Sequence, residues 1–225
     1  MVTLEDFSYQ PAHSHAGPRL LNLHCAQPGM VAIFGGNGSG KSTLAQLLAG
    51  WYPAYLPGSI SGTGLLLGQP LGQLSLPEQA QSVQLVQQSP WLQLSGCTFS
   101  VEEEVAFGPE NLCLSEAEIL DRLAASLALT DALPLRHRHP ATLSGGEAQR
   151  VVIACALAMQ PKILLLDDAF SRLTPQATRL MLERLSAWAA EQQSLIVLFE
   201  RKREPVFPFC QQAWQLTDEG VAPLC

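Results

Sequence analysis

A glycine-rich segment with one lysine and several hydroxyl residues is the first candidate site of the chain. It reads Gly35-Gly36-Asn37-Gly38-Ser39-Gly40-Lys41-Ser42-Thr43 and follows an apolar run at residues 31–34. Glycines let consecutive backbone N–H groups converge on phosphate oxygens, while Lys41 adds a positive charge and the Ser42 hydroxyl can ligate Mg²⁺. The apolar run predicts a buried strand, and leucines at positions 44, 47 and 48 predict a helix whose positive end points at the anion. The segment therefore predicts a phosphate-binding loop rather than a flexible linker.

A pair of carboxylates ends a second apolar run. Asp167 and Asp168 follow four aliphatic residues at 163–166. A buried strand of a parallel sheet delivers acids to its C-terminal edge, where a phosphate loop also lies. We expect Asp167 to hold Mg²⁺, either directly or through water.

A second glycine motif lies between these two, and it reads Leu143-Ser144-Gly145-Gly146-Glu147-Ala148-Gln149-Arg150. An apolar segment at 151–159 follows and predicts a helix. A serine hydroxyl and two glycine amides at a helix N-terminus form a cradle for phosphate. One chain thus carries two phosphate-binding motifs.

The elements that position these motifs alternate between strands and helices. Short strand-like segments broken by proline and glycine occupy residues 2–30 and predict a β-rich layer. Further strands are expected at 64–67, 83–87, 163–166 and 195–199, with a helix at 175–190. Strand-helix-strand alternation predicts a parallel α/β core.

The middle of the chain has helical spacing of its apolar residues. Leu120, Leu123, Ala124 and Leu127 fall on one face of a helix with a capping signal at Ser115 and Glu118. We expect one domain over residues 1–225, with the core and β layer at about 1–91 and 160–225 and a helical lobe at about 92–159.

The composition excludes several classes of protein. The chain has 225 residues, 47% of them hydrophobic, and a net charge of −7, which disfavours nucleic-acid binding. No apolar run approaches the roughly 20 residues that cross a bilayer, and the first residues lack a secretory signal. The six cysteines have no metal-ligand spacing and indicate reduced thiols rather than a disulfide frame. We therefore expect a globular protein without export or a membrane span.

The three motifs, in this order, resemble those of ABC-type ATPases over nearly the whole chain. The resemblance implies an α/β fold, a P-loop ABC ATPase with a parallel-sheet core, an N-terminal antiparallel β layer and a helical lobe. It implies ATP and Mg²⁺ as cofactors and a head-to-tail dimer of ATPase subunits. Ser144, Gly145, Gly146 and Glu147 then serve the nucleotide that the partner subunit binds.

Two further residues take roles from the resemblance. Tyr9 matches the aromatic residue that stacks on adenine, although a strand aromatic without that role is the alternative. Gln88 matches the glutamine that senses Mg²⁺ and the membrane partner, and Ser89-Pro90 after it favours Gln88 over the adjacent Gln87. The segment 101–112 is similar to one of the energy-coupling-factor ATPases, which serve cobalt, nickel and vitamin importers.

The chain departs from this family at the hydrolytic positions. Asp168 stands where the family has glutamate, and a misplacement of about 1 Å can cost about 100-fold in rate. Ala169 replaces a proline, and Thr174 replaces an aspartate. Glu200 stands where the family has a histidine that bonds the γ-phosphate, and the five histidines all lie at or before position 139.

A carboxylate at the histidine position opposes phosphate binding. Two like charges about 4 Å apart repel by about 4 kcal/mol at an effective dielectric of 20. We expect Glu200 to turn away, or the site to hold ATP without efficient hydrolysis. Arg201 offers an alternative positive charge. The catalytic candidates are therefore Asp168, Gln88 and Glu200.

These departures lead to one hypothesis and its alternatives. The chain is expected to be the ATP-binding subunit of an energy-coupling-factor importer of a vitamin or metal ion, peripheral on the cytoplasmic membrane face. Its own site is degenerate, and its signature serves a catalytic partner, so a heterodimer is favoured over a homodimer. An integral membrane subunit and a substrate-binding membrane component complete the assembly. The alternatives are an active homodimer and a soluble regulatory ABC protein.

Overall fold

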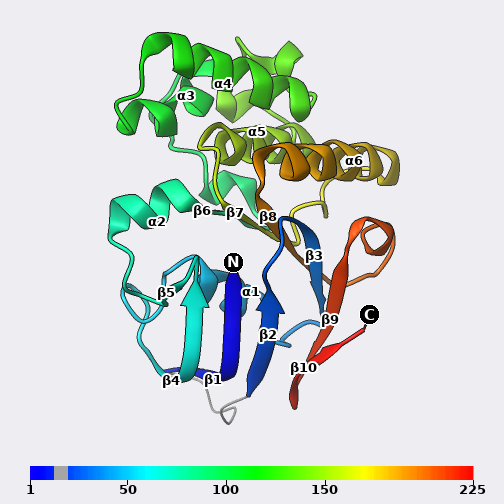
Figure 1. The fold of residues 1–225 in the computed structure, drawn as a ribbon. Coiled ribbons are helices and arrows are strands. Elements are labelled where there is room, and N and C mark those ends of the chain that lie inside the picture. Colours follow the sequence, from blue (N-terminus) through cyan, green and yellow to red (C-terminus); the bar gives the residue numbers. More distant parts are fainter. Residues whose placement is uncertain (13–19, 225) are drawn as a thin grey trace.

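A six-stranded sheet forms the middle layer of the computed structural model, which describes residues 1–12 and 20–224 (Figure 1). The strand order is β10-β9-β3-β8-β7-β6, and every pair is parallel except β9 with β10. The strands are β3 (Gly29–Phe34), β6 (Val83–Val86), β7 (Ile163–Asp167), β8 (Leu195–Glu200), β9 (Gln212–Thr217) and β10 (Gly220–Pro223). All residues of β3 and β7 are buried, because helices or a second sheet cover both faces.

A four-stranded antiparallel sheet and the helix α1 (Lys41–Leu48) cover one face of the central sheet. The strand order is β2-β1-β4-β5, formed by β1 (Val2–Pro11), β2 (Leu21–Cys25), β4 (Gly58–Leu66) and β5 (Gln69–Pro70). Buried and exposed residues alternate along β2, as expected of a strand with one solvated face. The expected N-terminal antiparallel layer is confirmed.

The helices α5 (Gly145–Ala158) and α6 (Pro175–Gln192) cover the opposite face (Figure 1). Thr174 caps the N-terminus of α6, and its side chain accepts a hydrogen bond from the Ala177 N–H at 3.3 Å. The expected helix at 175–190 and the expected parallel core are therefore confirmed.

A helical lobe lies above α5 and consists of α3 (Val101–Asn111) and α4 (Glu116–Leu129) with the short turns η1 (Pro90–Leu92), η2 (Leu133–Leu135) and η3 (Pro140–Thr142) (Figure 1). The remaining elements are α2 (Leu76–Ser82) and η4 (Phe207–Phe209). α4 begins at Ser115, whose side chain accepts from the Glu118 N–H as predicted.

The predicted apolar face of α4 is partly wrong. Leu123 and Leu127 are buried, but Leu120 is 47% exposed and Ala124 is exposed. Ser126 is buried instead, with its hydroxyl donating to the Arg122 carbonyl at 2.7 Å. The buried stripe is therefore centred on positions 123, 126 and 127, where a serine hydroxyl bonded to its own helix replaces an apolar side chain.

The register of the central sheet brings the motifs to one edge. Phe34 pairs with Glu200 across β3 and β8, and Asp167 pairs with Phe199 across β7 and β8. The carboxyl ends of three adjacent parallel strands therefore meet where β3 leads into α1, the place where ligands bind in open α/β sheets. No helix of the described residues is long and apolar enough to cross a membrane.

Candidate nucleotide site

The phosphate loop connects β3 to α1, as the sequence predicts. Gly38 and Gly40 adopt φ angles of +77° and +92°, which L side chains rarely adopt, and Gly40 caps the N-terminus of α1. A Cβ added at Gly36 or Gly38 meets no atom within 4 Å, so the loop borders open space. The backbone at Gly36 and Gly38 is therefore open to a ligand rather than covered by packed protein.

A pocket of about 540 Å³ lies beside this loop. It gathers residues from the phosphate loop, from the segment after β6 and from the ends of β7 and β8. Its lining consists of Asn37, Gly38, Ser39, Gly40, Lys41, Ser42, Thr43, Gln88, Asp167, Asp168 and Arg201. The structure thus brings together the predicted loop, Gln88 and both aspartates, and it adds Arg201.

Lys41 is buried at the base of the pocket. Its ammonium donates to the carbonyl oxygens of Gly35 at 2.8 Å and Gly36 at 3.0 Å. Burial lowers the pKa of Lys41, and the charges of Asp168 and Asp167 oppose that shift. The two nearby carboxylates thus favour the charged ammonium, the form that binds a phosphate.

Asp167 at the end of β7 lies in the same pocket as Ser42 and Gln88, and these three side chains suit a magnesium ion. Asp167 is 7% exposed and its carboxylate is hydrogen-bonded to the Ser42 side chain. Burial raises the pKa of Asp167, and the bond with Ser42 opposes the shift. Gln88 lines the same pocket and adds an amide oxygen. Hard oxygen donors with few carboxylates suit Mg²⁺ that also binds substrate phosphates, so Ser42, Asp167 and Gln88 would hold it.

Asp168 is held in place by its neighbours. Its backbone N–H donates to the Phe199 carbonyl at 2.9 Å, and its φ angle is 51°. Its Oδ2 lies 3.1 Å from the Arg201 Nε, and its side chain is 15% exposed against 45% for Arg201. A carboxylate with this ion pair is less free to orient a water molecule than an unpaired one.

Glu200 does not line the pocket, as expected of a carboxylate beside phosphate, but it packs against Asp168 rather than pointing to solvent. Burial, the charge of Asp168 and a hydrogen bond with that carboxyl together raise the pKa of Glu200 to about 8. Its Oε1 is buried and has no hydrogen-bond partner among the residues that the structure describes. At neutral pH Glu200 is therefore mainly protonated and adds little negative charge.

Gln88 and Gln87 have different surroundings, and the choice of Gln88 stays a prediction. Gln88 is exposed to the pocket, whereas Gln87 accepts at its backbone carbonyl from Gln149 and donates its N–H to the Gln93 Oε1 at 2.7 Å. Gln93 also donates to the Leu85 carbonyl at 2.7 Å. Gln93 thus fixes the backbone that carries Gln88.

The second glycine motif caps α5 away from this pocket. Ser144 and Glu147 form a reciprocal capping box, in which the Ser144 N–H donates to the Glu147 Oε2 at 2.7 Å. Arg138 holds the other Glu147 oxygen at 2.8 Å. A Cβ added at Gly146 would lie 3.1 Å from the Arg172 carbonyl oxygen, so the backbone passes close there. None of residues 144–147 lines the phosphate-loop pocket.

Tyr9 lies at the far end of β1 and packs against Tyr52, with ring centroids 4.5 Å apart. Burial and the neighbouring Tyr52 together raise the pKa of Tyr9 to about 12. Tyr9 does not line the phosphate-loop pocket. Its stacking on adenine stays a prediction.

A family model described as ABC transporter matches residues 19–171. The match covers the phosphate loop, the second glycine motif and the two aspartates. The chain therefore belongs to the ABC transporter family of ATP-binding proteins, and its fold is the ABC ATPase fold.

Two of the similar proteins have descriptions that name a type of transporter. The energy-coupling factor transporter ATP-binding protein EcfA of Methanosarcina acetivorans is 36% identical over 205 residues, 91% of this chain and 72% of that protein. The structure of cbiO1 from Clostridium perfringens, described as part of the ABC transporter complex cbiONQ, has a TM-score of 0.83 and 29% identity and covers 98% of this chain and 86% of that one.

Other relatives bear on length and fold alone. The first curated relatives that match include ABC transporter ATP-binding proteins of Methanosarcina mazei and Saccharolobus solfataricus, 35% and 38% identical over 98% and 85% of this chain. The chain spans only 37% and 36% of their lengths. The dimeric cassette MJ0796 bound to ADP and Pi has a TM-score of 0.83 at 22% identity, covers 100% of this chain and 99% of that one, and shows the fold.

Arg201 is the pocket residue that the predicted site set omits. The sequence signal was its place directly after the β8 strand, one residue beyond the histidine position of the family. Its pairing with Asp168 needs the parallel register of β7 and β8, which a local motif does not contain.

Proposed function

We propose that the chain is the ATP-binding subunit of an importer of the energy-coupling-factor type. The observation that carries the proposal is the pocket in which the phosphate loop, Lys41 and Asp167 meet. The likeness to EcfA and to cbiO1 supports this subfamily. ATP supplies a phosphoanhydride whose cleavage drives the assembly, and Mg²⁺ neutralises its charge.

The chain's own site is proposed to bind ATP with little hydrolysis. The Asp168 carboxylate is paired with Arg201 and contacts Glu200, so it is poorly placed to act as a base. Glu200 has no basic nitrogen with which to replace a histidine. The site thus keeps the phosphate-binding groups and lacks a free general base.

The second glycine motif is proposed to complete the site of a different ATPase subunit. Its capping box is intact, and Ser144 at the N-terminus of α5 is exposed. In a head-to-tail pair this motif faces the partner's nucleotide, and the partner supplies the glutamate and histidine. We favour this heterodimer over a homodimer.

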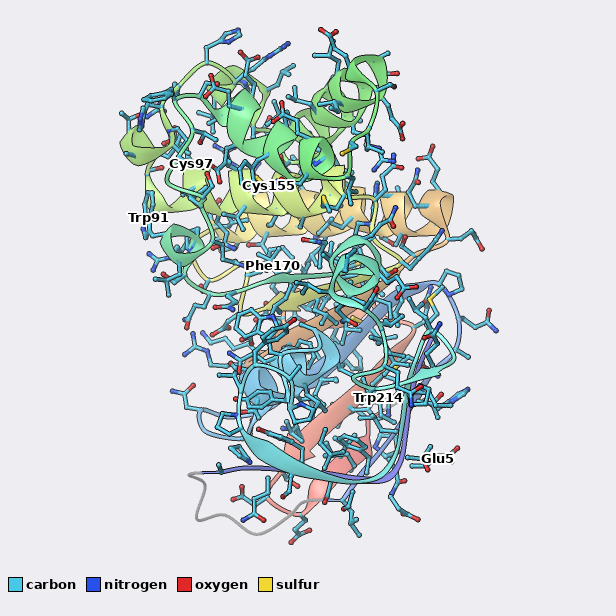
Figure 2. The ribbon with its side chains drawn as sticks, turned by 90° about the vertical axis from the view of Figure 1, so that its left-hand side faces the viewer. Glu5, Trp91, Cys97, Cys155, Phe170 and Trp214 are labelled. Carbon is cyan, nitrogen blue, oxygen red and sulfur yellow. The ribbon has the colours of Figure 1, made fainter. Side chains whose placement is uncertain are left out.

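A membrane subunit is proposed to dock beside Gln88. The surface from Gln88 to Phe107 carries four exposed apolar side chains, Trp91, Leu92, Phe99 and Phe107. Leu92 is 80% exposed, and Trp91 lies at the edge of the molecule on the same side as Cys97 (Figure 2). Grouped exposed apolar residues mark protein interaction sites. The chain would then lie on the cytoplasmic membrane face, and a separate membrane component would bind the vitamin or metal ion.

The proposal is tested by Mg-ATP hydrolysis and ATP binding of the purified chain over a wide range of its own concentration. Tight ATP binding without turnover is expected. Turnover that rises with dimerisation would support the active homodimer instead.

A matched pair of variants tests the division of labour in the assembled complex. Ser144→Arg should abolish turnover, because a long cation fills the cradle meant for the partner's phosphate. Asp168→Asn should change turnover little. The reverse pattern contradicts the heterodimer proposal. If the chain is instead a soluble regulatory ABC protein without a transport role, it should not cofractionate with membranes.

A further inference from the structure

Arg201 is fixed between the phosphate loop and Asp168 by the backbone around it. The Gly35 N–H donates to the Glu200 carbonyl at 3.1 Å, and the Asp168 N–H donates to the Phe199 carbonyl at 2.9 Å. The segment that leads into Arg201 is therefore bonded on one side to the first residue of the phosphate loop and on the other to the end of β7. Because β8 lies between β3 and β7, Arg201 follows the central one of the three strands whose carboxyl ends meet at the pocket.

The Arg201 side chain faces the pocket and has N–H donors beyond the one that its ion pair uses. It lines the pocket together with Lys41 and residues 37–43, and it remains 45% exposed. A guanidinium carries five N–H donors, and the ion pair with the Asp168 carboxylate uses the one on Nε. Its planar fork matches the oxygens of a phosphate, which it can bind with two parallel hydrogen bonds.

A phosphate can replace Asp168 as the ion-pair partner of Arg201. A pair whose cation is nearly half exposed contributes little to stability. A terminal phosphate carries more negative charge than one carboxylate and accepts from several donors at once. A phosphate that reaches this end of the pocket therefore competes well for the guanidinium.

We infer that Arg201 gives up its ion pair with Asp168 and binds the γ-phosphate of ATP. This exchange makes the site distinguish a nucleoside triphosphate from a diphosphate. The inference rests on the proposed ATP binding and adds to it a residue at the position after the missing histidine. ADP does not reach Arg201, so Arg201 stays paired with Asp168 when ADP is bound. The exchange is a change of ion-pair partner and requires no bond to form or break.

The test measures the affinities of ADP and of a non-hydrolysable β,γ-imido ATP analogue, both with Mg²⁺, by titration calorimetry. Arg201→Ala should weaken the triphosphate about 10- to 100-fold, as expected for loss of a charge-assisted hydrogen bond, and change ADP affinity less than about twofold. Arg201→Lys should keep part of the triphosphate affinity, because it retains the charge without the fork. Lys202→Ala is the matched control, an exposed cation one residue on that does not line the pocket.

The Asp168→Asn variant is a second, independent test of the inference. It should strengthen triphosphate binding several-fold, because it removes the competing partner of the guanidinium. Equal losses for both nucleotides in Arg201→Ala would assign Arg201 a structural role and overturn the inference, as would no loss at all. Failure of the unmodified chain to bind either nucleotide would instead overturn the proposed function itself. Preserved ADP affinity in each variant shows that the variant is folded.

Discussion

Replacing Glu200 with glutamine should change how the stability of the chain depends on pH. Burial and the neighbouring Asp168 carboxylate raise the pKa of Glu200 from the usual 4.5 to about 8, so the folded chain retains a proton that the unfolded chain releases above about pH 4.5. Stability that this group contributes is fully present below pH 4.5 and is lost as the pH rises towards 8. The whole window corresponds to about 5 kcal/mol, and the part between pH 6 and pH 8 to about 2 kcal/mol.

The glutamine variant keeps the shape of the side chain and cannot ionise. Urea unfolding of both proteins at pH 6, 7 and 8 should therefore show a stability difference that grows by about 2 kcal/mol in favour of Glu200→Gln as the pH rises. Glu5→Gln is the control, since Glu5 is exposed on β1 at the opposite end of the molecule from Trp91 (Figure 2). Parallel pH profiles for the Glu200 variant and the unmodified chain would refute the assignment of a protonated Glu200.

Three further predictions concern packing and thiol chemistry. The buried Glu104 carboxylate accepts hydrogen bonds from the Ser95 N–H at 2.6 Å and from the Ser95 hydroxyl at 2.8 Å. Glu104→Ala should therefore lower the unfolding free energy by about 3 kcal/mol in thermal denaturation, and Glu104→Gln should lower it by less. Ile153→Ala, at a fully buried position of α5, should cost about 2–5 kcal/mol in urea unfolding, whereas Leu120→Ala on the exposed face of α4 should stay within about 0.5 kcal/mol. Burial raises the pKa of the Cys25 thiol to about 12, so a thiol reagent at pH 8 should modify it only after unfolding; rapid labelling of the folded chain would contradict its burial.

Local motifs could be predicted from the sequence because their chemistry depends on short spacings. The phosphate loop needs glycines at fixed positions before Lys41, and the cap of α5 needs Ser144 three residues before Glu147, so both are visible in the chain itself. The order of strands and helices followed from the alternation of apolar runs. These predictions concern contacts between near neighbours in sequence.

Contacts across the sheet could not be predicted in the same way. The pairing of Arg201 with Asp168 depends on the register between two parallel strands, and no local spacing states it. β9 and β10 were not expected, because short strands of mixed polarity with one turn carry a weak pattern. The buried face of α4 was misjudged at Leu120, since an internally bonded Ser126 took its place.

The helix α5 belongs to two hydrophobic clusters at once. One side of α5 packs towards the central sheet through Val152, Ile153, Ala156 and Leu157, and the opposite side packs into the helical lobe through Ala148, Val151, Ala154 and Ala158. Each side therefore combines alanine with larger aliphatic side chains, and α5 lies close to both α3 and α4, so it is packed firmly against the lobe as well as against the sheet.

The motif that begins at Ser144 is therefore positioned by the sheet and by the helical lobe together. A displacement of the lobe relative to the sheet would strain the packing on one side of α5, the helix that carries Ser144 at its N-terminus. Enlarging one of the alanines that face the lobe should therefore push α3 and α4 away from α5 and disturb the phosphate cradle.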